Sequence, residues 1–155
     1  MNSYEEKLKT YLKEHQIQAE HLSFNQSCHS VAEAAVVVGA LAEDFVKSIC
    51  MIDLEGNFIV AIVKGEDKAS TTNVAKVLNI KERPRTAKPD EMLEKTGYPY
   101  GGTPVCGYSA IFLIDERVME KEIVYSGGGS ETSLLKIPTQ ELVKANNGKI
   151  VKIRK

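Results

Sequence analysis

The sequence predicts an α+β fold in which helices flank a mixed β-sheet, within one domain that spans residues 1–155. Segments with helical spacing and segments with strand spacing follow one another without the regular strand–helix–strand rhythm of a parallel α/β protein. No internal repeat and no linker divides the chain. A chain of 155 residues can bury about 70% of its extended surface around a single core.

The first half of the chain carries clear helix signals. One Ser-x-x-Glu capping box opens a predicted helix from Ser3 to about His15, and another opens an Ala/Val-rich helix from Ser30 to near Gly39. Because the second helix has so few polar residues, we expect burial on more than one of its sides. The polar stretch between the two helices has some strand character. A Ser/Thr cluster caps a third predicted helix over residues 70–78.

Two apolar runs, Phe45–Ile52 and Phe58–Val63, indicate a β-hairpin. A turn signal, Glu-Gly-Asn, separates them. The later elements follow in order: an extended segment at 80–87, a helix between Pro89 and Gly97, strands at 110–114, 122–125 and 134–137, a helix at 139–145 and a strand at 149–154.

The composition limits the possible partners. The formal net charge of −1 leaves no overall positive field to attract DNA or another polyanion. Local basic runs remain: residues 76–88 hold five basic residues and one acid, and residues 144–155 hold basic residues without an acid. Such runs are usually solvated faces, and a docked RNA strand is the alternative interpretation.

Targeting signals and metal motifs are lacking. The three cysteines are scattered without a C-x-x-C pair, which favours a reducing compartment over a disulfide framework. The first residues do not follow the order of a signal peptide, and no apolar run is long enough to cross a bilayer. Cys28-His29 has no second ligand pair at metal spacing. We therefore expect a cytoplasmic protein with no membrane contact, no metal and no cofactor.

The most unusual stretch is residues 97–107, which hold four of the eleven glycines and two of the five prolines. Glycine lets a ligand approach the backbone closely, so Gly101-Gly102 can present two bare N–H groups to a negative charge. An ordinary irregular connector is the alternative. Lys47 interrupts an apolar run. A lone ammonium is costly to bury, so it lies at a wet strand end or is held for a ligand anion.

The segment Ser126-Gly-Gly-Gly129 is a second glycine-rich candidate. It can form a phosphate-binding nest, and a flexible hairpin loop is the alternative. No Lys-Ser/Thr follows it, and the next segment has the pattern of a strand. This context excludes the P-loop and the dinucleotide-binding turn.

Taken in order, several segments resemble the YbaK/prolyl-tRNA-editing family of aminoacyl-tRNA deacylases. The resemblance extends from about residue 22 to residue 143. The matching segments are Ser30–Ala35, Phe45–Ser48, Val63–Asp67 with Val74–Leu78, Thr96–Pro104 and Val124–Gly128.

The resemblance implies an α+β enzyme that acts in trans in translation quality control. Its substrate would be mischarged tRNA bound by the acceptor end, above all Cys- or Ala-tRNA for proline, with prolyl-tRNA synthetase as a candidate partner. It implies catalytic roles for Lys47, Gly101 and Gly102. It implies substrate-binding roles for Phe24, Ser30, Ser48, Pro104, Ser126, Gly127 and Gly128.

Two departures from the family leave the amino acid that is removed open. Pro104 stands two residues after Gly102, where several members have three, and Ser133 stands where some relatives carry Asp. No motif places a histidine at the site, so proton transfer would fall to the ribose hydroxyl of the substrate. A non-catalytic module that binds tRNA 3′ ends or aminoacyl-adenosine is the alternative, and a structural subunit is a third interpretation.

Overall fold

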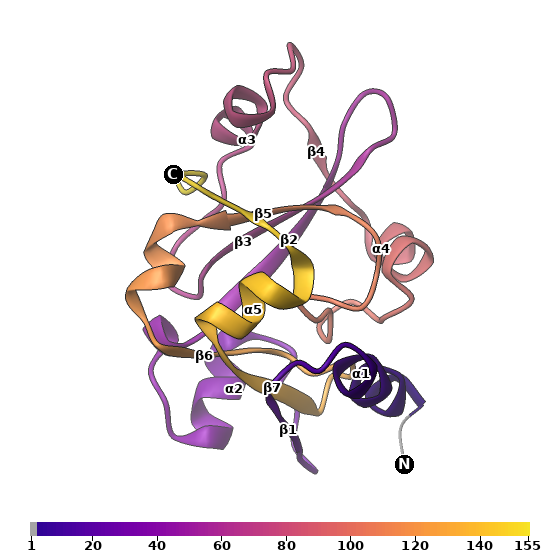
Figure 1. Ribbon diagram of the computed structural model, residues 1–155, viewed down its shortest axis with the longest axis vertical. Coiled ribbons are helices and arrows are strands. Elements are labelled where there is room, and N and C mark those ends of the chain that lie inside the picture. Colours follow the sequence, from indigo (N-terminus) through magenta and orange to yellow (C-terminus); the bar gives the residue numbers. More distant parts are fainter. Residues whose placement is uncertain (1–2) are drawn as a thin grey trace.

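Within residues 3–155, which the computed structural model describes, the strands form two sheets (Figure 1). A mixed five-stranded sheet has the order β4-β2-β3-β5-β8, and an antiparallel three-stranded sheet has the order β1-β7-β6. The strands are β1 (Glu20–Ser23), β2 (Val46–Ile52), β3 (Phe58–Lys64), β4 (Arg85–Thr86), β5 (Ile111–Asp115), β6 (Ile123–Gly127), β7 (Ser133–Pro138) and β8 (Lys149–Val151).

Helices cover both sheets. They are α1 (Ser3–Glu14), α2 (Val31–Val38), α3 (Thr71–Leu78), α4 (Pro89–Thr96) and α5 (Thr139–Asn146), with short 3₁₀ helices at Ala42–Asp44 and Glu116–Glu120. The predicted α+β class with a mixed sheet flanked by helices is therefore confirmed. The division of the strands into two sheets was not predicted, because pairing between distant strands leaves no local pattern in the sequence.

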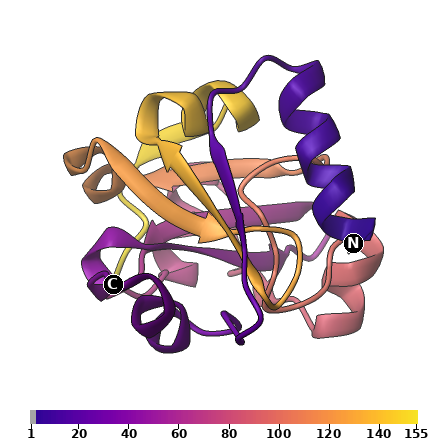
Figure 2. The same ribbon diagram turned by 90° about the horizontal axis from the view of Figure 1, so that it is seen from below.

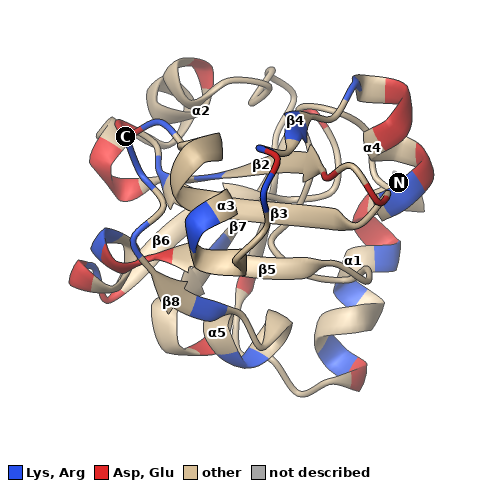
Figure 3. Cartoon of the chain, turned by 90° about the horizontal axis from the view of Figure 1, so that it is seen from above, with Lys and Arg blue, Asp and Glu red and all other residues tan. Residues whose placement is uncertain are grey.

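The hairpin predicted from the two apolar runs is the centre of the mixed sheet. β2 pairs antiparallel with β3 over its full length, from Val46 opposite Lys64 to Ile52 opposite Phe58. β3 then pairs in parallel with β5, and β5 pairs in parallel with β8. Every residue of β3 is buried, as expected for a central strand covered on both faces. In Figure 3 the strands β3 and β5 accordingly show little charge along their length.

The largest apolar cluster joins the mixed sheet to the antiparallel one. It combines Val60 and Ile62 of β3 with Leu135 and Ile137 of β7, and helices α1 and α5 contribute further side chains. A smaller cluster on the opposite face of the mixed sheet packs Val74 of α3 against the same strand. Figure 2 shows α2 and α4 on one side of the molecule, away from α5.

The predicted starts and ends of three helices are confirmed. Ser30 caps α2 by accepting the Glu33 backbone N–H at 3.1 Å, and Ser70 caps α3 in the same way. Pro89 occupies the first turn of α4, and Gly97 ends that helix in the left-handed conformation, with φ of 79°. Such caps are readable from sequence because they satisfy local backbone groups.

The expected burial of the second helix on more than one side is wrong. Among the residues of α2 only Ala34 is fully buried, and Val36 is 82% exposed. The helix lies at the edge of the molecule and packs one face against Phe45 and Leu134. No helix within residues 3–155 is long and apolar enough to span a bilayer.

Candidate functional site

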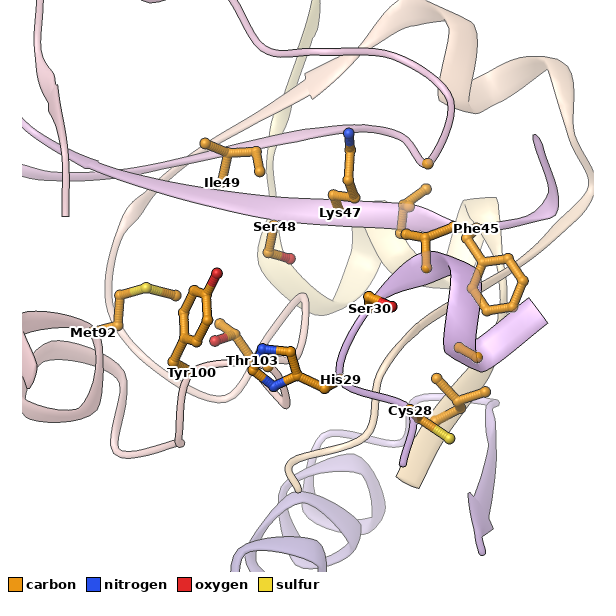
Figure 4. Close-up of a pocket in the computed structure, with 16 residues that line it drawn as sticks. Cys28, His29, Ser30, Phe45, Lys47, Ser48, Ile49, Met92, Tyr100 and Thr103 are labelled. Carbon is orange, nitrogen blue, oxygen red and sulfur yellow. The ribbon is translucent and has the colours of Figure 1, made fainter. Parts of the chain in front are cut away.

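A cavity of about 390 Å³ lies beside the first half of β2. Strand β4 pairs only with the far end of β2, at Met51 and Ile52, and Phe45 before β2 forms an isolated bridge to Tyr125 of β6. The stretch of β2 between these contacts has no strand partner on that side. The cavity is walled by β2, by the residues before α2 and by the glycine-rich loop at residues 97–107 (Figure 4). Its lining residues are Cys28, His29, Ser30, Val31, Ala34, Phe45, Val46, Lys47, Ser48, Ile49, Gly65, Met92, Tyr100, Gly101, Thr103 and Leu134.

Lys47 and Ser48 both line this cavity, and they leave β2 on opposite faces. Figure 4 shows Ser48 on the side that faces Tyr100 and Thr103, and Lys47 on the other side with its ammonium directed away from them. This arrangement follows from the twofold alternation of side chains along a strand. The lysine therefore lies at the rim and is turned away from the glycine-rich loop.

The environment of Lys47 leaves its charge uncompensated. Within residues 3–155 no carboxylate lies within ion-pair distance of its ammonium, and no hydrogen bond to it is formed. Burial lowers the pKa of Lys47, and the more distant charge of Asp67 opposes that effect only in part. Asp67 is itself held by Arg117 at 2.7 Å. A half-buried cation without a partner is suited to bind an anion from outside.

Gly101 forms the opposite wall. Its φ of 89° favours glycine, and the ring of His29 packs directly on its α-carbon, so a side chain at this position would have to displace the ring. His29 also meets Tyr100 edge to face, with ring centroids 5.1 Å apart. Its Nδ1 lies 3.3 Å from the Glu131 carboxylate. The Gly101 N–H has no hydrogen-bond acceptor among the described residues.

The prediction that Gly102 offers a second bare N–H is wrong. Its N–H donates to the Pro99 carbonyl at 3.1 Å, and its own carbonyl accepts from Gly129 at 2.8 Å. A Cβ added at Gly102 would stand 2.6 Å from the backbone of Ser130. The loop closes a turn on itself and packs against the β6–β7 turn, so Gly102 supports the wall without facing the cavity.

Three more predicted substrate-binding residues lie behind the loop and not in the cavity lining. Ser126 is buried, and its hydroxyl donates to the Gly127 carbonyl at 3.3 Å. A Cβ added at Gly127 would collide with the Thr103 carbonyl, and one added at Gly128 would stand 2.6 Å from the Leu134 nitrogen. This close packing of backbone on backbone explains the glycines without a ligand.

Two other predicted residues also lie outside the lining. Pro104 is buried, and its carbonyl accepts the Tyr108 hydroxyl at 2.7 Å. Phe24 is half-buried in the small apolar cluster that supports α2. Of the residues named from the sequence, the structure thus brings Ser30, Lys47, Ser48 and Gly101 together around the cavity.

Sequence reasoning missed several lining residues, among them His29, Met92, Tyr100 and Thr103. Tyr100 and Thr103 flank the glycine pair, so their place in the loop was the available signal. Met92 comes from α4, and only the packing of that helix beside β2 brings it to the cavity. His29 was weighed as a metal ligand, a pattern that gave no reason to place it beside Gly101.

The cysteines are poor nucleophiles. All three are buried free thiols, and burial raises the pKa of Cys50 and of Cys106 to about 12. Cys28 touches the cavity, and burial followed by the charge of Glu33 raises its pKa as well. The thiols thus remain protonated at neutral pH. Residues 3–155 hold no group of three or more His, Cys, Asp or Glu side chains that could bind a metal.

Comparisons with known proteins agree on the fold. The chain is 25% identical to hypothetical protein APE2540, with a TM-score of 0.88 over 96% of this chain and 99% of that one. It is 21% identical to a candidate trans-editing enzyme for prolyl-tRNA synthetase, with a TM-score of 0.91 over 100% and 99% of the two chains. No curated protein gives a match.

A family comparison is more specific. The model of the aminoacyl-tRNA editing domain matches residues 25–145, which include every residue that lines the cavity. That match covers well over half of the sequence. The chain therefore belongs to the aminoacyl-tRNA editing domain family.

Proposed function

We propose that this protein is a trans-acting aminoacyl-tRNA deacylase that hydrolyses the ester between a wrong amino acid and the 3′ end of tRNA. Cys-tRNA and Ala-tRNA of the proline acceptor are its expected substrates. The observation that carries the proposal is the pair of groups at one cavity, the unpartnered Lys47 ammonium and the unpartnered Gly101 N–H. Membership in the editing family supports it.

Hydrolysis of an aminoacyl ester needs no strong nucleophile from the protein. An aminoacyl ester is already activated, so water can attack its carbonyl without a covalent protein intermediate. Negative charge then develops on the carbonyl oxygen. We assign the Gly101 N–H as the donor to that oxygen, since no acceptor among residues 3–155 takes it up, and one well-aimed donor of this kind contributes about 3 kcal/mol to the transition state. Gly102 is assigned no such role, because Pro99 already accepts its N–H.

The direction of Lys47 favours one of the two roles that the sequence left open. Because its ammonium points away from the loop that carries Gly101, it is better placed to hold a phosphate of the terminal adenosine than to reach the oxyanion. Lys68 lies close enough to Lys47 to lower its pKa. The backbone N–H of Lys155 donates to the Lys68 carbonyl at 2.9 Å, so the basic C-terminal segment ends beside it (Figure 3).

These cations suggest how the acceptor end approaches. We infer that phosphates pass from Lys47 toward Lys68 and the C-terminal segment, and that binding is weak and sensitive to salt. A chain of this size has little surface for reading the rest of a tRNA, so prolyl-tRNA synthetase is a candidate partner that would raise the local substrate concentration.

The apolar part of the cavity suits a small side chain. Cys28, Ala34 and Phe45 are buried, and together with Ile49 they supply apolar surface opposite the polar loop. A synthetase pocket separates small side chains by only about 1–3 kcal/mol per methylene, so its errors call for a second, hydrolytic site. Such a site gains its selectivity by admitting small residues.

A deacylation time course on a panel of mischarged tRNAs tests the proposal. We expect wild-type protein to hydrolyse one or a few members and Lys47→Ala to lose about 100-fold in kcat/KM, since a hydrogen bond to a charged group contributes about 1.5–3 kcal/mol. Lys13→Ala, at an exposed position of α1, is the matched control. Both variants should melt at the wild-type temperature.

Two results would redirect the assignment. Full activity of Lys47→Ala would show that the lysine has no part in the reaction. If wild-type protein hydrolyses no member of the panel but binds a non-hydrolysable aminoacyl-adenosine, the protein is a binding module. If the wild-type protein neither hydrolyses any member of the panel nor binds that analogue, it is neither a deacylase nor a binding module for these ligands.

A further inference from the structure

His29 is the one imidazole among the residues that line the cavity of the described chain. It precedes the Ser30 cap of α2, and Figure 4 shows its ring between Ser30 and Tyr100, facing Thr103. Three contacts hold the ring: the α-carbon of Gly101 beneath it, the edge-to-face contact with Tyr100, and the Glu131 carboxylate 3.3 Å from Nδ1.

The Glu131 carboxylate lies beside Nδ1, at ion-pair distance and without the geometry of a hydrogen bond. A carboxylate on that side favours the neutral ring with its proton on Nδ1, which leaves Nε2 as the free nitrogen. This is the relation between acid and histidine that orients the base in hydrolytic triads. Resting on the proposed function, we propose that His29, held by Glu131, is the general base that activates water for deacylation.

The proposed step balances as follows. Nε2 of His29 takes a proton from water as the water oxygen forms a bond to the ester carbonyl carbon, and the carbonyl π electrons move to its oxygen beside the Gly101 N–H. The tetrahedral intermediate then collapses and breaks the bond to the ribose O3′. The proton on His29 passes to that O3′, so the products are tRNA with a free hydroxyl and the amino acid, whose carboxyl group releases a proton to solvent.

The polar and charged groups around the ring come from three segments. Glu131 approaches from the β6–β7 turn, Glu33 follows on the helix that His29 precedes, and Tyr100 contributes a phenol from the loop. Lys47 leaves β2 on the far side. A protonated imidazole cannot accept a proton from water, so the rate should fall on the acid side of the pH profile.

This proposal competes with proton transfer by the ribose 2′-hydroxyl of the substrate, and the two can be separated. Single-turnover rates would be measured across pH for wild-type, His29→Gln and Glu131→Gln proteins, with tRNA ending in adenosine or in 2′-deoxyadenosine. His15→Gln, at an exposed histidine directly after α1, is the matched control. Melting temperatures would be recorded for each variant.

We expect His29→Gln to lose about 100-fold in single-turnover rate with little change in KM, and to lose the acid limb of the profile. Glu131→Gln should lose less of the rate, because the ring no longer has a carboxylate beside Nδ1. The wild-type protein should retain turnover of the deoxy substrate. If His29→Gln does not fold, the loss of rate in Glu131→Gln at an unchanged melting temperature carries the test.

Other outcomes overturn the inference. A His29→Gln protein with the wild-type rate and pH profile would exclude the base, and so would a variant changed in KM alone. Complete loss of wild-type turnover on the deoxy substrate would assign proton transfer to the ribose. In each of these cases the wild-type protein still deacylates normal tRNA. Absence of that activity would instead overturn the proposed function itself.

Discussion

The glycines on the two sides of the loop at residues 97–107 look alike in sequence but differ in what packs against them. On the cavity side, Gly101 takes a positive φ and meets the ring of His29. On the far side, Gly102 packs against the backbone of Ser130, and Gly127 of β6 packs against the backbone of Thr103. Both contacts are too close for an added Cβ. A ring at the end of a side chain can move aside, but a hydrogen-bonded backbone cannot. Of the adjacent pair, Gly101 keeps an N–H without an acceptor among residues 3–155, whereas the Gly102 N–H donates to Pro99.

This difference shows how a glycine motif divides its work. One glycine lines the cavity, and the others let the β6–β7 turn approach the backbone of the loop closely. Substitutions on the far side should therefore act mainly on stability, and substitutions on the cavity side mainly on activity. Four variants test this division, from the largest expected change in stability to the smallest.

The largest effect is expected for Gly102→Ala. The new methyl group would meet the backbone nitrogen, carbon and oxygen of Ser130 at 2.6–2.7 Å. We expect a loss of about 3 kcal/mol in the free energy of unfolding, measured by urea denaturation. Gly56→Ala is the control, because its φ of 88° strains an alanine but nothing lies within 4 Å of an added Cβ, whereas Gly102 has the steric conflict without a positive φ. Equal losses in the two variants would refute the packing explanation.

The second effect concerns Glu5, which holds the β6–β7 turn through a hydrogen bond from Ser130. The buried Glu5 carboxylate accepts hydrogen bonds from Ser23 and Ser130. Burial acts to raise the pKa of Glu5, but these hydrogen bonds outweigh it, so the pKa lies below its ordinary value of 4.5. A lowered carboxyl pKa contributes stability at neutral pH that is lost as the pH falls through the folded-state pKa.

At pH 7 the free energy of unfolding of Glu5→Gln should accordingly be about 2 kcal/mol lower than that of the wild type. The difference should shrink as the pH falls below 4.5, because Glu5 of the unfolded chain is then protonated before Glu5 of the folded protein. Chemical denaturation at a series of pH values measures both. The exposed Glu14→Gln, also in α1, is the control. A difference that stays constant down to pH 3 would contradict the assignment.

The third variant, Gly101→Ala, lies on the cavity side. A left-handed conformation costs an alanine about 1 kcal/mol, and the His29 ring can turn away from the new methyl group. The stability loss should stay well below that of Gly102→Ala. The displaced ring and N–H should cost about 100-fold in kcat/KM on a mischarged tRNA. Loss of stability without loss of activity would reverse the proposed roles.

The smallest stability effect is expected for Lys47→Met. Because burial lowers the pKa of Lys47, the folded state disfavours the charged form, and stability should rise as the pH rises through the lowered pKa. At neutral pH the methionine removes that penalty. The free energy of unfolding should thus stay unchanged or increase by up to about 0.5 kcal/mol, while deacylation is lost. A marked fall in stability would assign Lys47 a structural role.

Much of the local structure could be predicted because its causes are local. The cap at Ser30, the stop at Gly97 and the β2–β3 turn each depend on groups within a few residues of one another. The burial of α2 could not be predicted in this way. Its composition was apolar, but its exposure depends on how many neighbours pack against it.

The sequence by itself determined the fold class, the hairpin at the centre of the mixed sheet, and the choice of Lys47 and Gly101 as candidate site residues. The tertiary structure alone decided which way the side chains and N–H groups of the site face. Strand alternation turns Lys47 away from Ser48, a turn takes up the Gly102 N–H, and a contact between segments far apart in the chain sets His29 beside Gly101 and Glu131. Local patterns report backbone preferences, but the contacts of a site arise from packing between distant segments.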